Sequence, residues 1–155
     1  MEKGNITYQY TEEYTEHYWI ERQESFMNKM RQSEGFLSMC HALPPYAVIV
    51  VSGSFKKVGV DRFYYVEQKL LENSFTPILP YMCYRVMPYI SSCNKNHYMS
   101  PCTQTQISFL KKIMISDGLF AVNVGGYIGE STALEIEFAR ANGKPVFMLE
   151  KEVSQ

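Results

Sequence analysis

Short, continuous apolar runs separated by segments of helical periodicity constrain the fold of this chain most strongly. The runs lie at Ala47–Val51, Leu119–Val122 and Val146–Leu149, with a weaker one at Thr76–Leu79. Because their apolar character is continuous rather than alternating, we expect parallel strands that are covered on both faces. Pro77 cannot donate to a central ladder, so the weaker run suits an edge strand.

Helical patterns at about 61–72, 103–115 and 132–142 separate these runs. The resulting β-α-β-α-β-α-β order predicts right-handed crossovers and a single doubly wound, flavodoxin-like or Rossmann-like α/β domain at residues 46–155. We expect its sheet to be mostly parallel, with roughly four to five strands. Asn142 and Gly143 are expected to end the last helix.

Residues 1–45 lie outside this pattern and are expected to form an N-terminal helical extension. A helix is predicted from about Thr11 to Arg31. Large side chains recur in it at helical spacing: Tyr14, Tyr18, Met27 and Met30. Such a stripe favours packing, here against a second subunit, over a cofactor site, so we expect a homo-oligomer.

The segment Pro80–Pro101 has no convincing period and is long for a connection within a compact domain. It carries several tyrosines, which argue against simple disorder: Tyr81, Tyr84, Tyr89 and Tyr98. We interpret this segment as a lid or a wall of the substrate site.

Charge and hydropathy exclude some partners. The net charge is −1 and no basic run occurs, so the chain lacks the footprint of a protein that binds a nucleic-acid polymer. No apolar run approaches the roughly 20 residues that cross a bilayer, so we expect no membrane partner. The polar, acidic N-terminus is unlike a secretory signal, which favours a cytoplasmic location.

The cysteines favour reduced thiols over a disulfide framework. Cys83, Cys93 and Cys102 cluster with His97, so a zinc site is the alternative. The paired C-x-x-C spacing of structural zinc sites is missing, and we therefore expect neither a metal nor a cofactor.

Two loops follow predicted strands and should meet at one edge of the sheet, because ligands of such sheets bind beyond the carboxyl ends of the strands. Their candidate substrate-binding residues are Gly53, Ser54 and Lys56 after the first strand, and Asn123, Gly125, Gly126 and Tyr127 after the third. The glycines either permit left-handed turns or let a ligand approach the backbone. Ser54 and Lys56 could bind a phosphate, with the lysine as a point charge.

Glu135 lies near the start of the last predicted helix and has two interpretations. Thr132–Glu135 matches a capping box, in which the glutamate returns to the backbone of the N-cap residue, and local spacing alone favours this structural role. The alternative is a carboxylate that attacks the anomeric carbon of a nucleoside. Ser131 and Thr132 are natural N-cap residues, and Ser131 could also donate to a phosphate or ribose oxygen. Glu130 is a candidate second carboxylate in the turn.

The stretch Ser131–Ala139, followed by Gly143–Val146, resembles the nucleoside 2-deoxyribosyltransferase-like superfamily. Val50–Ser54 is similar to the first strand of the deoxynucleoside monophosphate N-glycosidases in that superfamily. The resemblance implies that Glu135 is a nucleophile that attacks C1′ and forms a glycosyl-enzyme ester. It also implies that Ser54 and Ser131 lie near the 5′ end of the substrate, and that Lys56 replaces an arginine there.

One acidic residue that is common in the family is missing from this chain. The family commonly places an aspartate on the helix before the third strand, whereas here no acid occurs until Asp117. A weaker likeness links Gly125–Gly129 to the cytokinin-activating phosphoribohydrolases, which act on the same kind of bond. We therefore expect a transferase or hydrolase acting on the N-glycosidic bond of a small nucleoside or nucleotide. The alternatives are a non-catalytic nucleotide-binding or sensor domain and a structural partner protein built around residues 1–45.

Overall fold

The computed structural model describes residues 23–80 and 101–152, except for the side chains of residues 101–104. The chain divides into two compact units, Met1–Gln32 and Ser33–Gln155. Within the first unit, residues 23–32 are helical, as expected for the end of the predicted N-terminal helix. The rest of that helix, and the tyrosines of the segment interpreted as a lid, lie outside the described residues.

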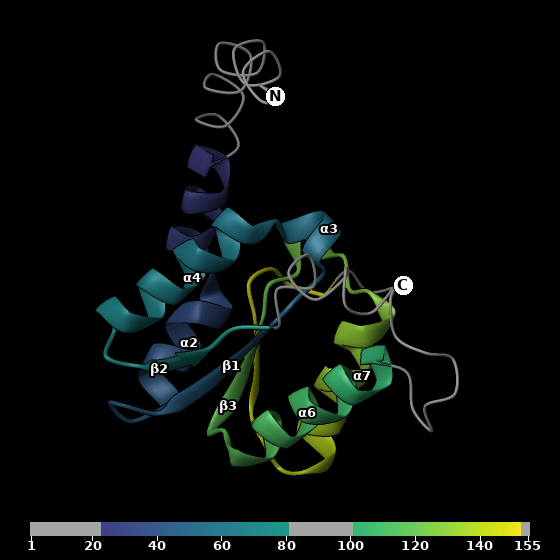
Figure 1. Ribbon diagram of the computed structural model, residues 1–155. Helices are drawn as coiled ribbons and strands as arrows, with labels where there is room; N and C mark the ends of the chain where they lie inside the picture. Colours follow the sequence, from purple (N-terminus) through teal and green to yellow (C-terminus); the bar gives the residue numbers. More distant parts are fainter. Residues whose placement is uncertain (1–22, 81–100, 153–155) are drawn as a thin grey trace, which may run out of the picture. The chain divides into compact units, whose positions relative to one another are not determined.

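The second unit is built on a four-stranded, all-parallel sheet (Figure 1). Its strands are β1 (Val48–Ser52), β2 (Thr76–Ile78), β3 (Gly118–Ala121) and β4 (Val146–Met148), in the order β2-β1-β3-β4. The predicted α/β class is confirmed, and β2, the strand with Pro77, lies at an edge as expected. The register places Ser52 opposite Ala121, and Ala121 opposite Met148.

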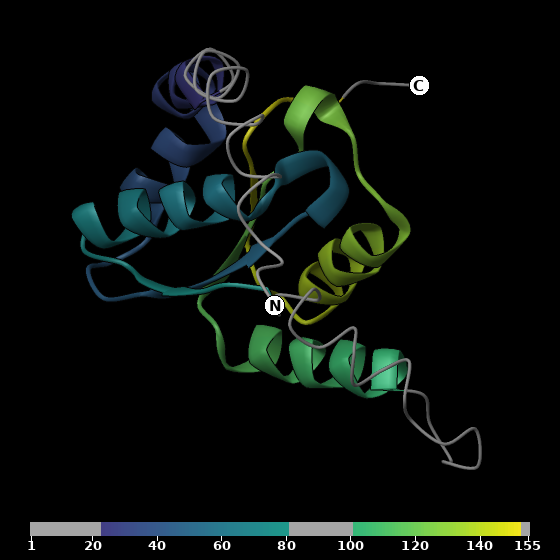
Figure 2. The same cartoon turned by 45° about the horizontal axis from the view of Figure 1, so that its top comes forward.

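Helices cover both faces of this sheet. They are α2 (Glu34–Ala42), α3 (Phe55–Val58), α4 (Val60–Glu72), α6 (Pro101–Ile115) and α7 (Glu130–Ala141). α4 packs against β2 and α2 against β4, whereas α6 and α7 pack against each other and against β1 and β3. Figure 2 shows α4 and α6 on opposite sides of the strands.

Alternation along β1 decides which side chains reach which helices. Val50 belongs to the apolar cluster that includes Phe109 of α6 and Ile136 of α7. Because successive side chains of a strand point to opposite faces, Ser52 points to the same side as Val50. Ser52 therefore ends the strand facing α7.

Helix α2 was not predicted from the sequence, and it packs the start of the second unit against the last strand. The Ser33 hydroxyl accepts from Phe36 N at 3.1 Å, which caps α2, and donates to the carbonyl oxygen of Leu149 at 2.7 Å. Gly35 packs so closely on β4 that a Cβ there would overlap the carbonyl oxygen of Met148. The predicted boundary between residues 45 and 46 stays a prediction.

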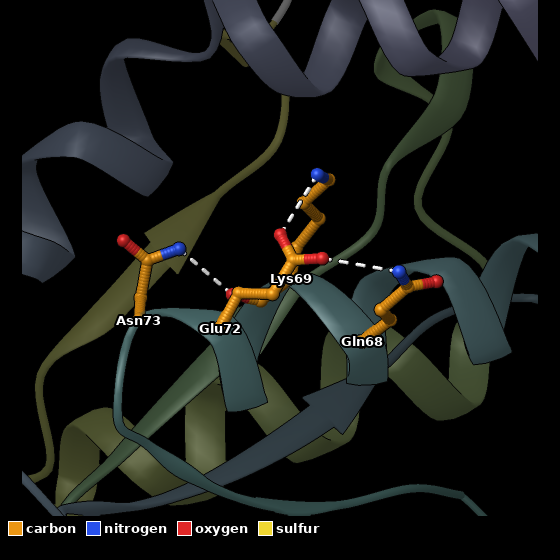
Figure 3. Close-up of polar contacts among 4 residues, drawn as sticks. All are labelled: Gln68, Lys69, Glu72 and Asn73. Carbon is orange, nitrogen blue, oxygen red and sulfur yellow. Dashed lines mark hydrogen bonds and ion pairs between the residues drawn. The ribbon is translucent and has the colours of Figure 1, made fainter.

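The C-terminal end of α4 carries a polar cluster on its surface (Figure 3). Glu72 accepts from Gln68 Nε2 at 3.0 Å and from Lys69 Nζ at 2.9 Å, and Asn73 Nδ2 donates to the Lys69 carbonyl at 2.8 Å. The lysine and the glutamine hold the pKa of Glu72 below its ordinary value. The next residue, Ser74, takes a left-handed conformation with φ of 64°.

α7 ends as predicted, with Asn142 as its C-cap and Gly143 at φ of 71°. Among the described residues, no helix is both long enough and apolar enough to cross a membrane.

Candidate functional site

The carboxyl ends of β1 and β3 form the switch point of the sheet. From β1 the chain turns into α3 and α4, and from β3 it turns into α7. α4 and α7 lie on opposite faces (Figure 2), so the two connections diverge at this point, which is where ligands of doubly wound sheets usually bind. The candidate site lies at this point.

Glu135 is buried at the switch point. It lies on the buried stripe of α7 with Thr132, Ile136 and Ala139, which follow the i, i+3, i+4, i+7 spacing of one helix face. Only 9% of Glu135 is exposed. A carboxylate therefore occupies a position on this helix where an apolar residue is usual.

Each carboxylate oxygen of Glu135 accepts a hydrogen bond from a side chain. The Ser52 hydroxyl donates to Oε2, and Gln106 Nε2 donates to Oε1 at 3.3 Å. Burial raises the pKa of Glu135 above its ordinary value, and the two hydrogen bonds act in the opposite direction. The result is a carboxylate that has lost most of its water but is fixed in direction by donors from β1 and α6, an arrangement suited to nucleophilic attack.

The capping-box interpretation of Glu135 is wrong. α7 begins at Glu130, its N-cap is Gly129, and no side chain caps it. Thr132 is therefore inside the first turn, and Glu135 lies beyond the position from which a glutamate reaches back to the N-cap. Ser131 and Thr132, expected as N-cap residues, are both helical, because the chain stays extended only as far as Gly129, with φ of −75° and ψ of 169°.

Two of the four candidates in the loop after β3, Asn123 and Gly125, contact the segment after β4. The buried side chain of Asn123 donates to the Glu150 carbonyl at 2.8 Å and accepts from Glu150 N at 2.9 Å. Gly125 N donates to the Glu150 carboxylate, within a 3₁₀ turn over Val124–Gly126. Tyr127 is 49% exposed.

Tyr127 also connects this loop to the segment after β1. The ammonium group of Lys57 lies 5.2 Å from the centroid of the Tyr127 ring. This distance is within the range of a cation–π contact. The two loops that the sequence predicted to converge are therefore in contact, through Lys57 and Tyr127.

The candidates after β1 and at the start of α7 are placed differently. A Cβ on Gly53 would meet the Val122 carbonyl oxygen at 3.1 Å, so its close neighbour is the protein itself. Ser54 is the N-cap of α3, without a side-chain cap bond. Lys56, Glu130 and Ser131 are exposed. Their roles at the site stay predictions.

Asp117 cannot supply the acid that the helix before β3 lacks. Its Oδ2 accepts from Val48 N at 2.7 Å, and its own N donates to the Val48 carbonyl at 2.8 Å. Val48 starts β1 and Ser52 ends it, so Asp117 and Glu135 are separated by the length of the strand, about 13 Å.

Ser52 and Gln106 were missed as site residues. The predicted first strand ended at Val51, which left Ser52 in the loop. Gln106 lies three and seven residues before the buried Phe109 and Ile113, a spacing that places it on the buried face of α6. That periodicity could have identified it.

Within residues 23–80 and 101–152, no group of three or more His, Cys, Asp or Glu side chains could hold a metal ion. The side chains of the alternative zinc cluster lie outside the described residues. Cys40 is a free thiol, and burial raises its pKa.

No protein-family model matches the sequence, and no curated protein matches it significantly. Among solved structures, the chain is similar to a 2-deoxyribosyltransferase from the psychrotolerant bacterium Bacillus psychrosaccharolyticus, at 19% identity and a TM-score of 0.45. The match covers 70% of this chain and 77% of that chain.

Proposed function

We propose that this chain cleaves the N-glycosidic bond of a small nucleoside or nucleotide, with Glu135 as the nucleophile. The observation that carries the proposal is the buried Glu135 carboxylate at the switch point, held by Ser52 and Gln106. The resemblance of Ser131–Ala139 to the deoxyribosyltransferase-like superfamily supports it from the sequence.

The reaction follows from this arrangement. An oxygen of Glu135 attacks C1′, the glycosidic bond breaks, and its electron pair leaves with the base. The product is a glycosyl ester of Glu135. Water then hydrolyses the ester, or a second base accepts the sugar, so the same intermediate serves a hydrolase and a transferase.

The leaving base needs a proton, and the partners of Glu135 are poor sources of one. Ser52 and Gln106 are neutral donors, and Asp117 lies at the far end of β1. Because no acid is positioned among the described partners of Glu135, the rate should be lower by a factor of about 10²–10⁴. We therefore expect slow cleavage of ordinary nucleosides and faster cleavage where the base leaves without a proton.

The test is a panel of nucleosides and nucleotides assayed for free base, including an N7-methylated purine nucleoside. Its base is positively charged in the substrate and leaves as a neutral molecule, so it bypasses the missing acid. We expect this substrate to react fastest, and mass spectrometry of the quenched enzyme to detect the sugar ester on Glu135. Glu135→Ala should abolish release, whereas Glu137→Ala, two residues along α7 and exposed, should not.

A non-catalytic nucleotide-binding or sensor domain is the second candidate, favoured by the hydrogen bond that each Glu135 oxygen accepts from a side chain of the protein. Binding of panel members with no release of base, the methylated substrate included, would select this alternative. Homo-oligomerisation and a closing role for the segment 80–101 remain part of the proposal, and deleting residues 1–32 and measuring mass in solution tests the first.

A further inference from the structure

Glu150 is held in a fixed position at the carboxyl edge of the sheet. It follows β4, and both its backbone N and its carbonyl bond the side chain of Asn123, at 2.9 and 2.8 Å. Asn123 is fully buried, so this clamp is part of the core. The main chain at residue 150 is therefore fixed independently of its own side chain.

The carboxylate of Glu150 accepts a hydrogen bond from Gly125 N. Gly125 and Gly126 have φ of 67° and 78°, and a Cβ on Gly125 would have no neighbour within 4 Å. Exposed backbone N–H groups in glycine turns commonly bind phosphate oxygens. Here the N–H group of Gly125 is already bonded to an anionic group of the protein, the Glu150 carboxylate.

We propose that Glu150 makes the site selective for nucleosides over nucleotides, because its carboxylate occupies the Gly125 N–H group and repels a 5′-phosphate. The inference rests on the proposed function and names its substrate class. Val122 N donates to the Ser52 carbonyl at 2.7 Å, and the Ser52 hydroxyl donates to Glu135. The chain that turns at Val124–Gly126 therefore leaves the sheet beside the residue that holds Glu135, and we place the 5′ side of the sugar against this turn. A phosphate there would have to displace a fixed negative charge, and like charges brought together are costly.

The neighbouring loop carries two positive charges, whereas the group bonded to the Gly125 N–H is the Glu150 carboxylate. Lys57 lies over the ring of Tyr127, and Lys56 is exposed on α3.

The experiment compares one nucleoside with its 5′-monophosphate on the full chain and on Glu150→Gln and Glu150→Ala. Glu152→Gln is the matched control, since it removes the same charge two residues along, from an exposed pair with Arg140. We expect the native chain to prefer the nucleoside in kcat/KM. Both Glu150 variants should raise kcat/KM for the monophosphate by about tenfold or more, with little change for the nucleoside and none in the control.

Native preference for the monophosphate, or the same gain in Glu152→Gln, overturns the proposal. If no substrate releases base, the proposed function fails and the inference is decided by binding, measured by calorimetry with the same two ligands. Tighter monophosphate binding to both Glu150 variants than to the native chain then supports it. Equal binding, or no binding to any of these proteins, overturns it.

Discussion

Two glutamates in this molecule each accept hydrogen bonds from two side chains, but their pKa values are shifted in opposite directions. Glu72, at the end of α4, accepts from a glutamine and a lysine (Figure 3), and Glu135, at the switch point, accepts from a glutamine and a serine. The pKa of Glu72 is lowered, whereas that of Glu135 is raised. Two differences account for this: the Lys69 ammonium group favours the ionised form of Glu72, and burial disfavours the ionised form of Glu135.

Hydrogen bonds alone do not make a carboxylate reactive. At Glu72 the donors add to solvation, so the ionised form is favoured and the cluster is a feature of the helix surface. At Glu135 the donors only partly replace the lost water, so burial raises the free energy of the ionised form. Forming a bond to carbon removes the charge and so relieves this penalty. We expect the two sites to respond differently to the same substitutions.

The largest difference should come from replacing each glutamate with glutamine. Glu135→Gln should lower kcat for base release by a factor of at least about 10³, because an amide cannot form the ester. Glu72→Gln should leave kcat within about twofold, as surface changes usually do. Steady-state assays with the N7-methylated substrate measure both, and equal losses in the two variants would contradict the comparison.

The next largest difference should come from replacing one hydrogen-bond donor at each glutamate. Ser52→Ala leaves a buried carboxylate oxygen without its partner, and a hydrogen bond to a charged group contributes about 1.5–3 kcal/mol. We expect kcat to fall by about 10- to 100-fold and the pKa of Glu135, followed by carbon-13 NMR of its carboxyl group, to rise further. Lys69→Met, which removes a donor to Glu72, is the control and should change neither quantity. An unchanged pKa of Glu135 in Ser52→Ala would refute the assigned bond.

Stability should depend on pH with opposite signs at the two sites. The folded pKa of Glu135 lies above its ordinary value of 4.5, so its contribution to stability is full below that value and is lost as pH rises through the folded pKa. Glu72 has a lowered folded pKa, so its contribution is present above 4.5 and is lost as pH falls.

Urea unfolding from pH 3 to 8 tests these signs. Relative to the native chain, Glu135→Gln should gain stability as pH rises, and Glu72→Gln should lose it. Parallel curves for the two variants would show that burial does not distinguish them.

The smallest effect is expected just beyond Glu72. Ser74 has φ of 64°, and its N and that of Phe75 close the end of α4 on the carbonyls of Leu71 and Leu70. Glycine adopts this conformation without strain, so Ser74→Gly should stabilise the fold by about 0.5–1 kcal/mol without affecting activity. Thermal unfolding measures this gain, and a loss of stability would show that the serine side chain has a role of its own.

The fold could be predicted from the sequence because its signals are local. Continuous runs such as Ala47–Val51 and Val146–Leu149 became β1 and β4 with shifts of one residue at their ends. Pro77 identified an edge strand for a chemical reason, and Asn142-Gly143 identified the end of α7. Each inference needed only neighbouring residues.

The site could be predicted only in part, because its contacts are distant in sequence. Ser52 and Glu135 are 83 positions apart, and Gln106 and Glu135 are 29 apart. The local pattern identified Glu135 as a residue near the start of a helix. It also favoured a capping role for Glu135, because Ser131 and Thr132 are typical N-cap residues, whereas the N-cap of α7 is Gly129. Only the packing of α6 and α7 on β1 brings the donors to the carboxylate.

The hydrogen bond between Ser33 and Leu149 has a consequence for circular permutation of the second unit. It joins positions 116 apart, so the first and last secondary elements of the unit are neighbours. Circular permutation succeeds where the original ends are close and the new ends lie in an exposed turn. A short glycine-serine linker from Glu152 to Ser33, with new ends opened at the exposed Gly143, should therefore give a chain that folds to the same sheet.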